Sequence, residues 1–130
     1  MSNYPHLFKP LQINRYVYKN RIISGPILPG PFFQKEKTAA LTYRRIETRA
    51  KGGSAAVQIG ETSINYTDAA RIPFRPIDYS VYSGPGFDGF KKYADIIKKH
   101  DAMALVEIFH AGREKEPLPG ETNPRGPVGF

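Results

Sequence analysis

Three short apolar segments alternate with two amphipathic segments along this chain, and the alternation restricts the folds that it can adopt. The apolar segments are residues 22–26, 55–60 and the first part of 103–113, and none is long enough for an independent helix. We expect the first and the third to be buried strands. The amphipathic segments, residues 38–52 and 87–100, repeat apolar side chains at three- and four-residue intervals. Strands that alternate with helices in this way typically form a parallel sheet with the helices packed on it. We therefore predict an α/β fold.

The ends of the two predicted helices carry residue types that helix ends favour. Gly52 and Gly53 follow the first helix, where a left-handed residue commonly closes the last turn. Asp88 is expected in the first turn of the second helix and Lys98 in its last turn, as the helix dipole favours.

Two further segments lie outside this alternation. Apolar runs on either side of residues 14–16 predict a small β-hairpin with Asn14 at its turn. Residues 65–86 have no sustained period and contain three prolines, which predicts a long irregular connection of the kind that is often functional.

Composition excludes several classes of protein. The chain has no cysteine, which excludes disulfides, iron–sulfur ligation by this segment and a cysteinyl cofactor linkage. No apolar run could span a bilayer and residues 1–6 lack the apolar core of an export signal, so we expect a cytoplasmic protein without a membrane partner. The net charge of +7 is scattered over the helical segments, which favours solvated helix faces over nucleic-acid binding. A small basic nucleic-acid-binding domain stays open as an alternative.

Glu107 is unusual because it lies inside the third apolar segment. A carboxylate buried in a strand costs on the order of several kcal/mol unless a donor or a ligand replaces the lost solvation. His110 and Arg113 follow at the carboxyl end of the same strand, which is where α/β folds hold ligands. Alternatively, Glu107 pairs with a buried Arg or Lys and His110 caps a loop.

Five short motifs occur along the chain in this order: Leu7-Phe8-Lys9-Pro10-Leu11, Lys19-Asn20-Arg21-Ile22, Arg49-Ala50-Lys51-Gly52-Gly53, Glu107-Ile108-Phe109-His110-Ala111-Gly112-Arg113 and Arg125-Gly126-Pro127. Together they resemble the amino-terminal third of the Old Yellow Enzyme family of FMN-dependent NADH:flavin oxidoreductases. The fourth motif is most similar to the branch that contains trimethylamine dehydrogenase and 2,4-dienoyl-CoA reductase.

The resemblance implies a flavin-binding (β/α)8 TIM barrel with FMN across the carboxyl ends of its strands. Such a barrel needs about 250 residues, so residues 1–130 would be the incomplete amino-terminal part of one barrel domain. They would form a short β-hairpin followed by the first three β/α units.

The resemblance also implies positions for individual residues. Pro26, Ile27 and Leu28 would lie beside the isoalloxazine ring, and Glu107 would face its pyrimidine half. Thr62 would follow the second strand, at the edge of the ring. His110 and Arg113 would lie on the substrate side. No catalytic residue and no metal ligand is assigned.

Two of these positions depart from the family pattern. Family members often have Gln where this chain has Glu107, and a carboxylate can accept the flavin N3 proton but cannot donate to O2. It would also oppose the negative charge of a reduced ring. Some relatives carry Cys where this chain has Leu28, in certain branches joined covalently to flavin.

The function implied is an FMN-dependent oxidoreductase. It would pass hydride from NADH or NADPH through FMN to an unsaturated or amine-type small molecule. The alternative is a non-catalytic barrel fragment that acts as an oligomerising or complementing subunit. Because three strands would expose two sheet edges, we expect a homo-oligomer or a complementing chain as partner.

Overall fold

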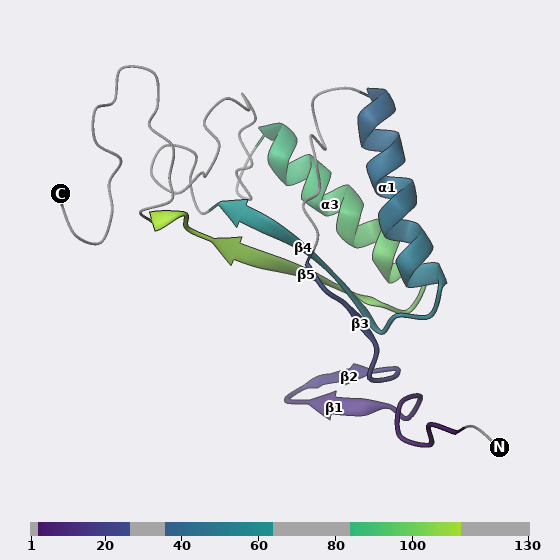
Figure 1. Cartoon of the computed structure of the whole chain (residues 1–130). Helices are drawn as coiled ribbons and strands as arrows, with labels where there is room; N and C mark the ends of the chain where they lie inside the picture. Colours follow the sequence, from purple (N-terminus) through teal and green to yellow (C-terminus); the bar gives the residue numbers. More distant parts are fainter. Residues whose placement is uncertain (1–2, 27–35, 64–83, 113–130) are drawn as a thin grey trace.

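The computed structural model of the chain describes residues 3–26, 36–63 and 84–112 (Figure 1). Two antiparallel strands come first, and a three-stranded parallel sheet with two helices follows. This arrangement confirms the predicted α/β class and the parallel sheet. The elements in chain order are β1 (Leu11–Ile13), β2 (Tyr16–Tyr18), β3 (Ile23–Ser24), α1 (Glu36–Lys51), β4 (Ala56–Ser63), α3 (Gly84–Lys98) and β5 (Met103–Phe109).

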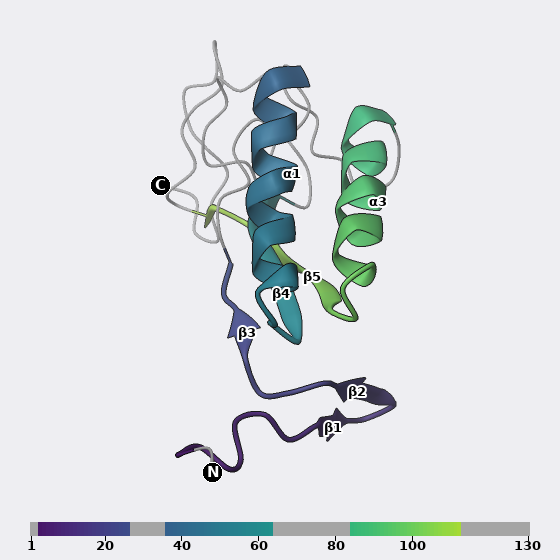
Figure 2. The same ribbon diagram turned by 90° about the vertical axis from the view of Figure 1, so that its right-hand side faces the viewer.

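Strands β1 and β2 pair around a two-residue turn. Ile13 lies opposite Tyr16, so Asn14 and Arg15 form the turn between them. Asn14 has a φ of 53°, in the left-handed region that Asn tolerates better than most residues. Figures 1 and 2 show that these two strands lie apart from the helices, below the parallel sheet.

The parallel sheet has the order β3-β4-β5, and its helices lie side by side on one face (Figures 1 and 2). Side chains from both helices and from the helix-facing positions of β4 form the core, because these positions recur at helical and strand periods. The buried core residues are Tyr43, Ile46, Ala50, Val57, Ile59, Tyr93, Ile97 and Ala102.

Tyr93 fixes α3 over the line where β4 and β5 meet. Its hydroxyl lies within hydrogen-bonding distance of the carbonyl of Val57 on β4 and, at 3.0 Å, of the carbonyl of Leu105 on β5. The single hydroxyl proton can be shared between these two acceptors. Burial raises the pKa of Tyr93 far above its ordinary value, and burial also raises the pKa of Tyr43.

The segment before β3 ties the amino end of the sheet to the turns that follow both helices. Asn20 donates from Nδ2 to the Gly53 carbonyl (2.8 Å) and accepts the Ile22 N–H at Oδ1 (2.9 Å). Lys19 Nζ donates to the carbonyl of His100 (2.6 Å). Gly53 has a φ of 103°, which a residue with a side chain rarely adopts. Two of the five family motifs therefore have a structural explanation at this end of the sheet.

Two sequence-based expectations about the elements are wrong. Helix α3 begins at Gly84, so Asp88 lies beyond its first turn, which contains no acidic residue. Pro85 is compatible with this earlier start, because a proline in the first turn removes no intrahelical hydrogen bond. The first strand was expected to be buried, yet Ile23 is 49% exposed. Among the described strands only β4 pairs with β3, which leaves the other edge of β3 open.

Neither helix of the described residues has the length and apolar character that crossing a membrane would require.

Candidate functional site

The carboxyl ends of β3, β4 and β5 bring three predicted site residues to one edge of the sheet. Pro26 follows β3 and is exposed, Thr62 lies near the end of β4, and Glu107 lies near the end of β5. Parallel pairing puts these ends side by side. Ile27 and Leu28, which follow Pro26, lie outside the described residues, as does Arg113.

Glu107 lies on the sheet face that the helices leave uncovered. Ala104 packs against the helix-covered core, and successive side chains of a strand point to opposite faces. Leu105 and Glu107 therefore share the other face. In a (β/α)8 barrel this face is the interior, because the helices form the outer layer.

The Glu107 side chain lies directly over Gly60 of the neighbouring strand β4. A Cβ atom added at Gly60 would lie 1.9 Å from Glu107 Oε2 and 2.9 Å from both its Cβ and its Cδ. Only glycine leaves room for the side chain in this position. The carboxylate is thereby held across two strands.

An irregularity in the pairing of β4 with β5 accompanies this contact. Ile59 lies opposite Val106 and Thr62 lies opposite Ile108, so two residues of β4 face the single residue Glu107. This is a β-bulge, which bends a strand locally and re-aims the side chains beside it.

The carboxylate of Glu107 is half-buried, less than the sequence suggested. The next residue, Ile108, lies on the opposite face of the strand and is 73% exposed. Within residues 3–26, 36–63 and 84–112, no Lys, Arg or His forms an ion pair with Glu107. The alternative in which Glu107 pairs with a buried cation therefore finds no partner in this part of the chain.

Thr62 was expected just after the second strand, but β4 continues to Ser63 and includes it. Its side chain is 3% exposed, and its Oγ1 is buried without a hydrogen-bond partner among the described residues. A hydroxyl in this situation is costly unless another group bonds to it. Thr62 thus offers an unused donor and acceptor at the carboxyl edge.

His110 is exposed just after β5, and its ring closes the local turn. The imidazole Nδ1 accepts the backbone N–H of Gly112 at 2.9 Å, and Gly112 has a φ of 54°. This is the loop-capping arrangement that the sequence left open for His110. A neutral ring with this contact carries its proton on Nε2, which is the nitrogen left for other contacts.

Gly60 is the site residue that the sequence-based reasoning missed. A glycine inside an otherwise apolar strand often marks a bulge or a close approach of another group. Gly60 stands directly after Ile59 in such a strand, so the signal was present.

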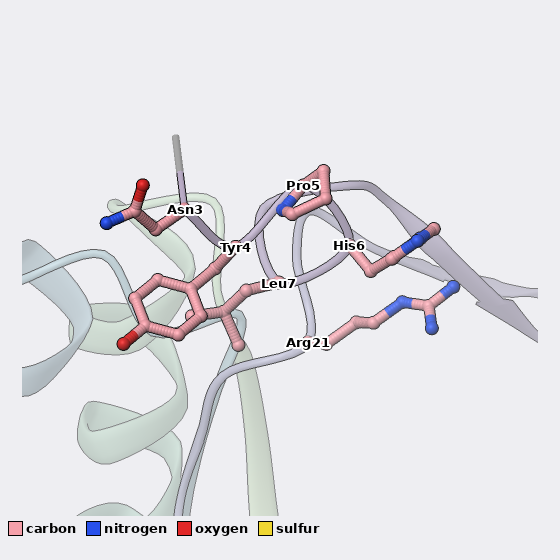
Figure 3. Close-up of a pocket in the computed structure, with 6 residues that line it drawn as sticks. All are labelled: Asn3, Tyr4, Pro5, His6, Leu7 and Arg21. Atoms are coloured by element: carbon pink, nitrogen blue, oxygen red, sulfur yellow. The ribbon is translucent and has the colours of Figure 1, made fainter. Parts of the chain in front are cut away.

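A shallow cavity of about 380 Å³ lies at the other end of the sheet, before β3. Figure 3 shows that Tyr4 points away from His6 and Arg21, so the polar groups do not converge on one point. No group of three or more potential metal ligands occurs within the described residues. The lining residues are Asn3, Tyr4, Pro5, His6, Leu7 and Arg21.

The chain belongs to the NADH:flavin oxidoreductase / NADH oxidase family, whose profile matches residues 6–128. The enzymes of this family are oxidoreductases that use FMN, and related NADPH dehydrogenases and NADH oxidases use reduced nicotinamide cofactors. The predicted family is thereby confirmed.

Particular relatives and solved structures are similar to most of this chain. An NADPH dehydrogenase of Bacillus cytotoxicus is 29% identical over 112 residues, which cover 85% of this chain and 31% of that protein. The old yellow enzyme of Trypanosoma cruzi has a similar fold (TM-score 0.65, 19% identity, 89% of this chain and 30% of that one). The 6-hydroxypseudooxynicotine amine oxidase of Pseudomonas geniculata N1 also has a similar fold (TM-score 0.64, 28% identity), and the match covers 85% of this chain and 16% of that one. The chain spans less than a third of the length of each.

The described residues fit one edge of a flavin. The isoalloxazine ring presents an imide N–H between two carbonyl oxygens, and a carboxylate such as that of Glu107 can accept from the N–H. The buried hydroxyl of Thr62 can donate to a carbonyl oxygen, and it has no described partner that competes. Gly60 provides the space that the carboxylate needs.

Proposed function

We propose that this chain forms the isoalloxazine-binding part of an FMN-dependent oxidoreductase, and that β3, β4 and β5 belong to the first three β/α units of its barrel. The observation that carries the proposal is the Glu107 carboxylate, which lies over Gly60 on the helix-free face near the carboxyl end of β5. Ligands of barrel folds bind at these strand ends. The match to the family supports the choice of flavin as ligand.

Each predicted residue then has a specific task. Glu107 accepts the imide N–H of the ring, and the hydroxyl of Thr62 and backbone groups near Pro26 bond to its polar edge. Ile27 and Leu28 pack beside the ring. FMN, when bound, supplies hydride transfer from NADH or NADPH to a small molecule.

For the substrate, we propose an unsaturated or amine-type small molecule in contact with His110 and Arg113. The run from His110 to Arg113 is similar to that of the branch with trimethylamine dehydrogenase and 2,4-dienoyl-CoA reductase. The 28% identity with an amine oxidase supports the same branch. The exposed His110 ring keeps Nε2 for a substrate atom while Nδ1 holds the loop.

The test is the visible absorbance spectrum of the 130-residue chain after equilibration with flavin and gel filtration. Because the net charge of +7 attracts phosphate non-specifically, the chain is equilibrated with riboflavin and with FMN in high salt. Both flavins should remain bound, since the proposed contacts are to the ring. A colourless chain in both cases contradicts the proposal.

A second candidate function, a non-catalytic oligomerising or complementing subunit, is favoured by apolar side chains on the outer strands. Ile23 on β3 is 49% exposed and Ile108 on β5 is 73% exposed. Such open edges promote association. A melting temperature that rises with protein concentration, in a chain that retains no flavin, would support this function. A concentration-independent melting temperature would argue against it.

A further inference from the structure

We propose that Gly60 is a positioning residue for Glu107, and that the Glu107 carboxylate, in the position that Gly60 allows, makes the site favour oxidised over reduced flavin. The proposal rests on the proposed function, and it adds a residue and a redox preference to that site. Three observations support it: the contact between the two residues, the bulge beside them, and the charge of Glu107.

The contact explains why position 60 must lack a side chain. Glu107 Oε2 would lie 1.9 Å from an added Cβ, but this atom is the end of a flexible side chain and can rotate away. Glu107 Cβ would lie 2.9 Å from the added atom and is fixed to the backbone, so it cannot. An alanine at position 60 therefore moves the carboxylate away from β4 and shifts the strands slightly.

The bulge shows that the pairing of the strands is adapted to this contact. Between the pairs Ile59–Val106 and Thr62–Ile108, β4 has one residue more than β5. The extra residue interrupts the ladder beside Glu107, and bulges of this kind are common next to functional sites. Gly60 lies at the start of the irregularity, where its missing side chain leaves the space that Glu107 occupies.

The negative charge of the Glu107 carboxylate determines its effect on a bound ring. A carboxylate only accepts hydrogen bonds, and no cation among the described residues pairs with Glu107. Oxidised isoalloxazine is neutral and offers an imide N–H, whereas the reduced ring carries additional negative charge on the same half. The carboxylate therefore disfavours the reduced form, and removing it should raise the midpoint potential of the bound flavin.

The experiment compares four variants of the full chain with the parent. Affinities for oxidised and reduced FMN are measured anaerobically by fluorescence, and midpoint potentials by equilibration with a reference dye. The variants are Glu107→Gln, Gly60→Ala, Glu107→Gly, and Gly60→Ala combined with Glu107→Gly. Val17→Ala is the control, because Val17 is 61% exposed on β2, which lies away from the carboxyl edge of the sheet (Figure 1).

Glu107→Gln should change the ratio of the two affinities about tenfold in favour of reduced FMN, which is about 30 mV for a two-electron couple. Gly60→Ala should raise the potential in the same direction, although it leaves the carboxylate in the chain. It should have no further effect on the potential when Glu107→Gly is already present, because the group that it displaces is gone. Val17→Ala should match the parent.

The possible failures can be distinguished. If the parent retains no flavin, the proposed function fails and this inference fails with it. If the parent binds flavin but Glu107→Gln leaves the potential unchanged, the redox preference is wrong and this inference fails, whereas the proposed function stands. If Gly60→Ala lowers affinity without shifting the potential, or shifts it equally in the Glu107→Gly background, Gly60 does not act through Glu107 and the positioning role is overturned.

Discussion

The two ends of the parallel sheet differ in how their polar groups are satisfied. At the amino end, Asn20 uses both its amide nitrogen and its oxygen on backbone partners, and Lys19 bonds to the carbonyl of His100. At the carboxyl end, the hydroxyl of Thr62 and the carboxylate of Glu107 have no such partner among the described residues. Asn20 and Lys19 thus hold the amino end together, whereas Thr62 and Glu107 keep hydrogen-bonding capacity at the carboxyl end. Barrel enzymes divide stability and function between their two ends in the same way.

The largest expected effect is at the amino end. Asn20→Ala removes two hydrogen bonds of a buried side chain and leaves the Gly53 carbonyl and the Ile22 N–H without their partner. We expect a loss of about 3 kcal/mol in the free energy of unfolding, measured by urea titration. The exposed Asn3→Ala is the control and should change stability by less than about 0.5 kcal/mol. Equal effects of the two substitutions would remove the contrast between the ends.

Tyr93→Phe tests the link between α3 and the two strands. Loss of the hydroxyl should cost about 1 to 2 kcal/mol near neutral pH, because the carbonyls of Val57 and Leu105 lose a donor. Above the ordinary tyrosine pKa of about 10, the unfolded chain loses this proton while the folded chain keeps it. The unfolded state then binds fewer protons, so the stability of the parent falls as pH rises.

The stability of the Tyr93→Phe variant should fall less steeply at alkaline pH than that of the parent, as measured by urea midpoints between about pH 8 and pH 11. Tyr16→Phe, at an exposed position in β2, should keep the slope of the parent. An unchanged slope in Tyr93→Phe would show that the buried hydroxyl does not cause the fall.

Thr62→Val tests the carboxyl end, where we expect a change in stability opposite in sign to that of Asn20→Ala. The substitution removes a buried hydroxyl that has no described partner, so stability should stay equal or rise by up to about 1 kcal/mol. Flavin affinity should fall about fivefold, as for the loss of one ligand hydrogen bond of about 1 kcal/mol. A clear loss of stability in a urea titration would instead reveal a structural hydrogen bond at Thr62.

The smallest effect is expected for the contact between α1 and the turn after α3, which is an ion pair only when His100 is protonated. His100 Nε2 lies 3.1 Å from Glu47 Oε1, and the Glu47 side chain is 45% exposed. Glu47→Gln should therefore cost only about 0.3 kcal/mol, and less in high salt. A cost above about 1 kcal/mol that persists in salt would make this contact part of the amino-end network.

The features that the sequence predicted well are those with a repeating pattern. The alternation of strands and helices follows from local periodicity, and the shared carboxyl edge follows from parallel pairing. Individual exposures were harder to predict, because the exposure of Ile23 depends on whether another strand covers its edge. The contact between Gly60 and Glu107 was not predicted. Predicting it requires knowledge of the register of β4 against β5, and a one-residue bulge changes that register locally. Gly60 marked the position, but the sequence did not say which side chain lies over it.

The bond between Lys19 and the carbonyl of His100 also bears on the order in which the chain folds. It joins residues 81 positions apart, whereas the bond between Asn20 and Gly53 joins residues 33 apart. During synthesis, Gly53 leaves the ribosome well before His100 does, and contacts of long sequence separation form slowly. The bond to Gly53 can therefore form before α3 has been made, whereas the bond to His100 can form only when the chain has passed residue 100.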